Sequence, residues 1–244
     1  MKRRLFISAG VLSVVGIAGC MGNTQSGTTL PQEEYPDGLS QTGLSVDTLV
    51  SSNSPFLQTN SVTINIEQTS GNGTTTVTSK IDSTVPAYTL QSVNNFQGNE
   101  TMTKQYFDGD VLYTNRNSSD EYQTEQLTFN KQREYYVGFI QELLNGVSFS
   151  FHTVTDQGVL EYQTQSMDDF SDTSQFTGPD VVNAVVTVRL TKEGLFKEIT
   201  TEVERSVGNE SDQTDIFTQS IQFTNYDETT FSEPAWVDSA RQQA

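Results

Sequence analysis

The segment Val62–Ile81, VTINIEQTSGNGTTTVTSKI, decides the fold class of this chain. In its first half Val62, Ile64 and Ile66 alternate with polar residues, and the period of two resumes after the glycine-rich stretch 71–73. A period of two places successive side chains on opposite faces of a β-strand, and a short Gly/Asn turn joins antiparallel neighbours. The segment is therefore predicted to be a β-hairpin with one apolar face and one polar face.

The same alternation recurs along most of the chain and predicts further strands. These are 87–96, 101–108, 111–116, 121–129, 147–155, 158–165, 181–192, 195–207 and 213–226. Lys131–Asn145 departs from the pattern, because its apolar side chains follow helical spacing up to a stop at Gly146. A short helix over Val46–Asn53 is predicted, capped by Ser45 and interrupted by Pro55. The tail from Thr229 to Ala244 is predicted to end as an edge strand or a short helix that docks Trp236, the one tryptophan.

Many strands with one apolar face and a single long helix set a packing problem, because one helix cannot cover so wide a sheet. The usual solutions are two sheets packed face to face or one sheet curled around its own apolar face. We predict a mainly β (α+β) fold in which residues 35–244 form one domain. Its expected architecture is a half-barrel, a curled antiparallel sheet of 10–11 strands with one inserted amphipathic helix, and the alternative is a β-sandwich.

The N-terminus reads as an export signal over residues 1–19. A basic start is followed by an apolar run that is too short and too glycine-rich for a stable membrane span. Arg3, Arg4 and Phe6 resemble the twin-arginine signal R-R-x-F-[LI], which implies passage across the membrane as a folded protein.

The stretch Ile17-Ala18-Gly19-Cys20 resembles a lipobox, so Cys20, the only cysteine, is predicted to carry the lipid anchor. Two lipid chains hold a protein durably on a membrane. Residues 20–34 have no apolar period and are predicted to be a flexible tether that reaches roughly 20 Å. The expected location is the outer side of the cell membrane; a soluble secreted protein with a chance cysteine is the alternative.

Composition excludes several classes of function. The chain has 31 acidic and 13 basic residues, a net charge of −18, which disfavours nucleic acid as a partner. One His and one Cys leave no zinc cluster, no Cys/His nucleophile pair and no intrachain disulfide. We therefore expect no enzymatic activity, no metal and no cofactor. Signal cleavage removes three basic residues and leaves a net charge of −21, which suits concentrated salt because salt screens the repulsion.

Three weaker patterns have ordinary explanations. His152 lies on the opposite parity from Phe149 and Phe151, which indicates a solvent-facing strand position. The acidic stretch Asp168–Asp180 does not match the spacing of an EF-hand calcium loop. The glycosylation sequence N-x-[ST] occurs about as often as composition alone predicts, always in a predicted turn that faces the exterior. The four asparagines are Asn72, Asn99, Asn117 and Asn209.

Three motifs carry a resemblance to known families. They are Tyr35-Pro36-Asp37-Gly38-Leu39-Ser40 with Gly43-Leu44, Phe107–Tyr113 (FDGDVLY), and Pro234-Ala235-Trp236. Together with the acidic composition, they resemble an uncharacterised family of haloarchaeal surface lipoproteins over the whole mature chain. More distantly, the strand order and the inserted helix are similar to the carrier-type half-barrel of the LolA/LppX type, found in bacterial lipoprotein carriers and mycobacterial lipid-binding lipoproteins. Neither resemblance implies a catalytic residue.

Two functional hypotheses follow. In the first, the half-barrel binds an apolar or lipid-like ligand beneath a helical lid formed by Tyr135, Tyr136, Phe139, Ile140, Leu143 and Leu144. In the second, the core is filled and the protein is a non-catalytic structural or interaction protein of the cell envelope. A transporter's substrate-binding subunit fits less well, because the chain lacks repeated α/β patterns. A void inside the apolar face would separate the first two hypotheses.

Overall fold

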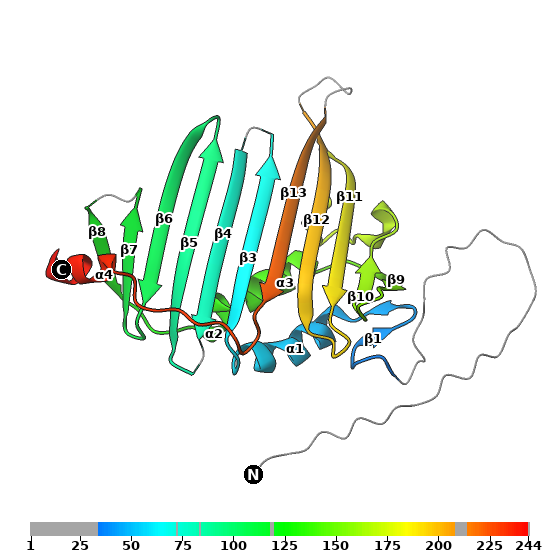
Figure 1. The fold of residues 1–244 in the computed structure, drawn as a ribbon. Coiled ribbons are helices and arrows are strands. Elements are labelled where there is room, and N and C mark those ends of the chain that lie inside the picture. The colour runs from blue at the N-terminus through cyan, green and yellow to red at the C-terminus, as the bar shows by residue number, and fades with distance from the viewer. Residues whose placement is uncertain (1–33, 72, 83, 118–119, 208–213, 244) are drawn as a thin grey trace, which may run out of the picture.

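The computed structural model describes residues 34–71, 73–82, 84–117, 120–207 and 214–243. One antiparallel sheet contains eleven strands in the order β8-β7-β6-β5-β4-β3-β13-β12-β11-β10-β9 (Figure 1). The bounds are β3 (Val62–Ser70), β4 (Gly73–Asp82), β5 (Ala87–Phe96), β6 (Asn99–Phe107), β7 (Val111–Arg116), β8 (Tyr122–Gln126), β9 (Ser150–Val154), β10 (Leu160–Gln163), β11 (Val181–Leu190), β12 (Phe196–Ser206) and β13 (Thr214–Thr224). The sheet is open, with β8 and β9 at its two edges, so the β-sandwich alternative is wrong.

Two runs of sequential strands build this sheet. Strands β3 to β8 follow one another across one half, and β9 to β13 cross the other half. The two runs meet where β13 pairs with β3, for example at Ile221 opposite Ile66. A separate hairpin of β1 (Leu39–Ser40) and β2 (Gly43–Leu44) precedes them.

Different elements cover the two faces of the sheet. The helices are α1 (Val46–Leu57), α2 (Lys131–Glu134), α3 (Val137–Leu144) and α4 (Trp236–Gln243). In Figure 1, α2 and α3 lie behind the strands, whereas the segment leading to α4 crosses in front of them. We call the side packed by α1 and α3 the helix face; it carries the buried Ile64, Ile199 and Ile221. The opposite side, where Thr63 contacts Thr229 of the C-terminal segment, is the open face.

The helix predicted over 131–145 is split in two. Tyr136 adopts a left-handed conformation (φ 57°, ψ 17°) between α2 and α3. In a continuous helix, neighbouring side chains lie only about 100° apart. The break lets the buried Tyr135 donate its hydroxyl to the carbonyl of Asn60, at 3.2 Å, while Tyr136 bonds to Ser79 of the sheet. The stabilisation from the two hydrogen bonds of these adjacent tyrosines therefore outweighs the conformational strain of one left-handed residue.

Helix α1 continues through Pro55 to Leu57, so the predicted interruption is wrong. Leu57 is buried in the main core, and the ring of Phe56 packs edge-on against Tyr226 at 5.4 Å. These contacts hold the last turn, although proline removes one backbone donor. The predicted cap is confirmed, because the Thr48 amide donates to the Ser45 hydroxyl at 3.4 Å.

The C-terminal tail forms a short helix, which is one of the two structures predicted for it. The Trp236 indole stacks on the Tyr122 ring with 6.0 Å between centroids. Val237 and Ala240 of α4 bury a small core against Tyr106 and Tyr113 on the open face. The helix therefore closes one end of the open face.

Candidate functional site

An apolar groove lies on the helix face, between the α2–α3 segment and strands β3, β4 and β13. Its volume is about 580 Å³. It is lined by Ile66, Gln68, Val77, Asn130, Arg133, Tyr136, Gly138, Phe139 and Gln219. This is the place where the helix face is incompletely covered by α3.

The sheet supplies the floor of the groove through two cross-strand pairs. Ile66 lies opposite Val77, and Gln68 lies opposite Gln219. The side chain of Gln219 is buried, and so is that of Ile66. The floor therefore changes from apolar to amide along the strands, which suits a ligand with an apolar body and a polar end.

Helix α3 supplies the wall through Gly138 and Phe139. Phe139 is 37% exposed, whereas Ile140 and Leu144 of the same helix are almost completely buried. A Cβ added at Gly138 would meet no atom within 4 Å. The wall therefore consists of an exposed aromatic ring next to a position that has no side chain.

The rim of the groove is electrostatically neutral. Burial, and then the nearby Glu134 carboxylate, raise the pKa of Tyr136 to about 12, against a hydrogen bond to Ser79 that lowers it. Tyr136 is therefore a neutral phenol at ordinary pH. The Arg133 guanidinium forms an ion pair with Glu134, and that hydrogen bond raises the pKa of Arg133. The arrangement can hold and orient an apolar molecule, and no nucleophile and base lie paired among the residues that line it.

The predicted lid agrees with the structure only in part. Four of its six members, Tyr135, Ile140, Leu143 and Leu144, are ordinary core residues. Only Tyr136 and Phe139 line the groove. Phe139 was expected on the same packed face as Ile140, but α3 turns it outward. The sequence contained a signal for the groove that was missed. Gln68 and Gln219 occupy positions in their strands where the alternation predicts an apolar residue.

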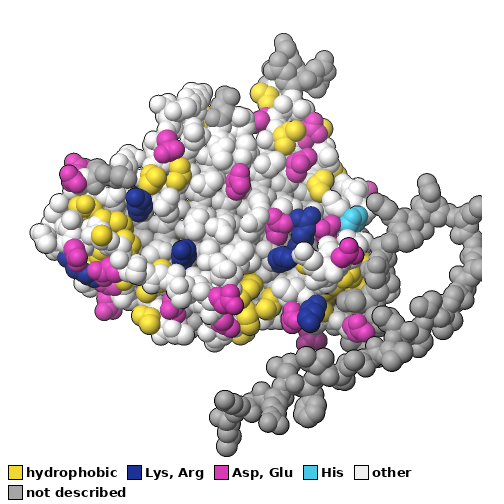
Figure 2. All heavy atoms as spheres, viewed as in Figure 1, with side chains coloured by type: hydrophobic (Ala, Val, Ile, Leu, Met, Phe, Trp, Pro, Cys, Tyr) yellow, Lys and Arg dark blue, Asp and Glu magenta, His cyan; other side chains and the backbone are white. Residues whose placement is uncertain are grey.

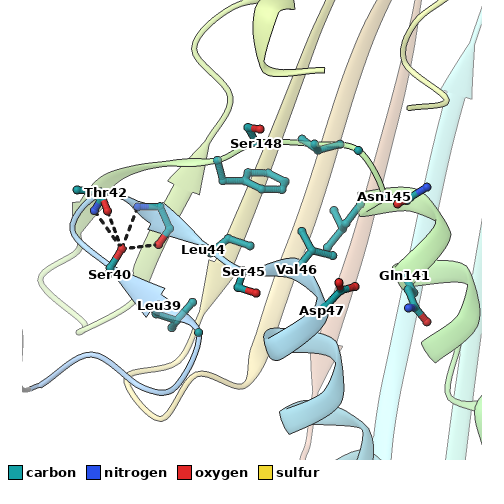
Figure 3. A pocket seen from close by; sticks show the side chains of 16 residues that line it. Leu39, Ser40, Thr42, Leu44, Ser45, Val46, Asp47, Gln141, Asn145 and Ser148 are labelled. Carbon is teal, nitrogen blue, oxygen red and sulfur yellow. Dashed lines mark hydrogen bonds between the residues drawn. The ribbon is translucent and has the colours of Figure 1, made fainter. Parts of the chain in front are cut away.

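A second pocket, of about 590 Å³, lies under the β1–β2 hairpin. Figure 3 shows its polar rim, where Asp47, Gln141, Asn145 and Ser148 surround Leu44 and Val46. The Ser40 hydroxyl bonds to Thr42 and Gly43 and braces the hairpin, as the dashed lines in Figure 3 show. Its hydrogen bonds thus serve the hairpin itself.

The remaining predicted positions have varied outcomes. His152 is exposed on β9, as predicted, with its Nε2 atom 3.8 Å from a carboxylate oxygen of Glu161. Asn99 is the first residue of β6 and pairs with Phe96 across the turn at 97–98, so it lies where the turn joins the strand. Asn117 is exposed in a left-handed conformation, and its side-chain oxygen accepts from the Met102 amide at 3.0 Å. Other positions lie outside the described residues: Arg3, Arg4, Phe6, Cys20, Asn72 and Asn209.

One carboxylate of the acidic stretch 168–180, that of Asp169, bonds to nearby backbone amides. The Asp169 carboxylate accepts from the Ser166 amide and completes a capping box at the start of a short 3₁₀ turn. Within the described ranges, no three His, Cys, Asp or Glu residues gather as metal ligands would. No helix in those ranges is long and apolar enough to cross a membrane.

Comparison with solved structures shows a similarity of fold to a known lipoprotein. No family model matches the chain, and no curated protein matches it. The crystal structure of the Mycobacterium tuberculosis lipoprotein LppX aligns with a TM-score of 0.41 and 11% sequence identity, over 78% of this chain and 100% of that chain. A similarity of this size leaves the ligand open.

Proposed function

We propose that this protein is a membrane-anchored extracytoplasmic lipoprotein that binds a lipid-like or apolar ligand in the groove beside α3. One observation carries the proposal: Phe139 stands exposed over an apolar groove of about 580 Å³, in a helix whose other large apolar side chains are buried. An exposed ring of this kind loses water contact when an apolar ligand covers it, which is favourable.

The groove has the size and chemistry of a ligand site. Small-molecule sites typically span about 300–1,000 Å³ and combine apolar walls with a few polar groups. Here Ile66, Val77 and Phe139 would contact the apolar body of the ligand. The amides of Gln68 and Gln219 would take its polar end. Each Å² of apolar ligand surface removed from water would contribute about 25 cal/mol.

The sequence supports the location. The lipobox-like Cys20 and the paired Arg3 and Arg4 predict export followed by lipidation. A lipid anchor and a short tether would keep the groove near the membrane, where amphiphiles are concentrated. The alternative is an envelope interaction protein without a small ligand. It is supported by the four lid residues that proved to be core.

A variant in which leucine replaces Gly138 and fills the groove distinguishes these two functions in a binding test. Purified protein in concentrated salt is titrated with the neutral fluorophore N-phenylnaphthylamine. We expect saturable binding by wild type, and an affinity at least about tenfold lower in Gly138→Leu, a loss of about 1.4 kcal/mol. Helix stability should not fall, because leucine is a better helix former than glycine.

Gln141→Leu is the matched control, because it adds the same side chain to an exposed position of α3 that faces the hairpin pocket. It should leave binding unchanged. Absence of saturable binding by the folded wild type would favour the envelope interaction protein. Equal loss in both variants would place the fluorophore elsewhere.

A further inference from the structure

A larger groove crosses the open face of the sheet, on the side opposite the apolar groove. It lies between strands β4–β6 and the C-terminal segment, and its volume is about 950 Å³. Its lining residues are Thr78, Lys80, Thr89, Leu90, Gln91, Lys104, Gln105, Thr230, Phe231, Ser232, Pro234 and Trp236. Figure 2 shows this face: much of its surface is neither charged nor hydrophobic, with a few basic and acidic groups scattered over it. The groove is therefore polar, unlike the one beside α3.

Two lysines in the groove keep an unneutralised charge. Neither Lys80 nor Lys104 forms an ion pair within the described part of the chain. Among the other described cations, Arg133, Arg189, Lys192 and Arg241 pair with carboxylates, whereas Arg116, Lys197 and Arg205 form no ion pair with a described residue. A pair of free cations within one groove favours an anionic ligand.

Strand register sets the two lysines diagonally across β5. Lys80 lies opposite Thr89, and Lys104 lies opposite Gln91. Their Cα atoms are thus separated by two strands, about 10 Å, and by two residues, about 7 Å, along the strands. Thr78, which faces Gln91, completes a floor of hydroxyl and amide groups between the two charges. That floor offers hydrogen bonds to a ligand with many hydroxyl groups.

The C-terminal segment gives the groove a fixed apolar wall. Phe231 and Trp236 line it, and the Trp236 indole stacks on the Tyr122 ring. Arg241 of α4 forms an ion pair with Glu233 at 2.5 Å, and its guanidinium lies 5.3 Å above the ring of Tyr113 on β7, which connects α4 to the sheet. The faces of aromatic rings carry partial negative charge and attract the C–H groups of sugar rings. A wall held in advance lowers the ordering cost of binding.

We infer that this groove binds an acidic oligosaccharide, with carboxylates on its sugar rings paired to Lys80 and Lys104. Sugar hydroxyls bond to the threonine and glutamine floor, and the C–H faces of the rings pack against Phe231 and Trp236. A purely apolar ligand would leave the floor without hydrogen bonds, and a neutral sugar would make no use of the lysines. Salt screens the repulsion between such a ligand and the acidic protein, because the Debye length is only about 3 Å at 1 M. The inference is independent of the function proposed for the apolar groove.

Calorimetric titration of the full-length protein with oligogalacturonate tests this inference. We expect saturable binding, no heat with a neutral malto-oligosaccharide, and at least tenfold weaker binding by the Lys80→Gln/Lys104→Gln variant. The matched control, Lys192→Gln/Lys197→Gln, removes the same charge from exposed lysines outside the groove. It should bind as wild type does, and so should Gly138→Leu.

Three results would overturn the inference. The first is no binding by the folded wild type, and the second is an equal loss in the two lysine variants, which would reflect net charge alone. The third is equally tight binding of oligoglutamate, which offers carboxylates without sugar rings and would make this an acidic-peptide site. Circular dichroism of each variant checks that the sheet is intact.

Discussion

Replacing Asn53 by alanine should destabilise the whole domain, because this side chain ties α1 to the turn between β11 and β12. Asn53 is only 1% exposed. Its Nδ2 donates to the carbonyls of Leu49 at 3.0 Å and Gly194 at 2.9 Å. Its Oδ1 accepts from the Phe196 amide at 3.1 Å. One amide therefore satisfies two backbone groups that lie more than 140 positions away in the sequence.

The magnitude follows from the groups left behind. In Asn53→Ala the Phe196 N–H and the Gly194 C=O lose this partner inside the protein. An unsatisfied buried polar group costs about 1–3 kcal/mol. We expect a loss of roughly 3 kcal/mol, which corresponds to a Tm lowered by about 6–12 °C in a domain of this size.

Chemical denaturation in concentrated salt, followed by far-ultraviolet circular dichroism, measures the loss. Asn60→Ala is the matched control, because the Asn60 side chain bonds locally, to Phe56 at 2.7 Å, and is only partly buried. It should cost about 0.5–1 kcal/mol. If the two variants lose equal stability, or if Asn53→Ala unfolds as wild type does, the long-range bonds do not stabilise the domain as argued.

Four further outcomes are expected. Cys20→Ser should release the protein into the medium or leave the precursor uncleaved, as cell fractionation would show; a membrane-bound product of mature size would contradict lipidation. The thermal midpoint should fall as salt drops below a few tenths molar, because the net charge of −18 then repels itself, and a constant midpoint would refute this. Thr201→Val should stabilise the protein by about 1 kcal/mol in urea, since the buried Thr201 hydroxyl has no hydrogen-bond partner among the described residues; a loss of stability would show a hidden partner. Burial raises the pKa of Tyr88, Tyr162 and Tyr226, so their contribution to stability is present below about pH 10 and lost as the pH rises through the folded values; tyrosinate absorbance should therefore appear together with unfolding, and its appearance in an intact sheet would count against the argument.

Local pattern was sufficient to predict the sheet. Alternation along Val62–Ile81 forms the β3–β4 hairpin, and the strand predicted over 111–116 has the bounds of β7. The prediction works because every second residue of a half-buried strand faces the core and is apolar. The predicted ends of other strands, such as β9 and β10, differ from the observed ends by a few residues. The apolar alternation continues past the last residue that pairs with the neighbouring strand, so it does not mark where the strand ends.

The errors arose where distant partners decide the conformation. The spacing of Tyr135 and Tyr136 fits a continuous helix, and only Asn60 and Ser79 explain why the backbone breaks there. Pro55 is tolerated because α1 packs on the core. The groove floor could have been found from Gln68 and Gln219, which interrupt the apolar parity of their strands. The groove itself required knowledge of how far α3 reaches across the sheet.

Pairing of β13 with β3 has a consequence for the order of folding. Each half of the sheet is built from strands that are neighbours in the sequence, but Phe217 must find Ser70 across almost the whole domain. Contacts of such long range form slowly, because the intervening chain must be ordered first. Until β13 has left the ribosome, both half-sheets expose unpaired edges that invite association with other chains. Completion of the central seam is therefore the step that pairs these edges and joins the two halves into one continuous sheet.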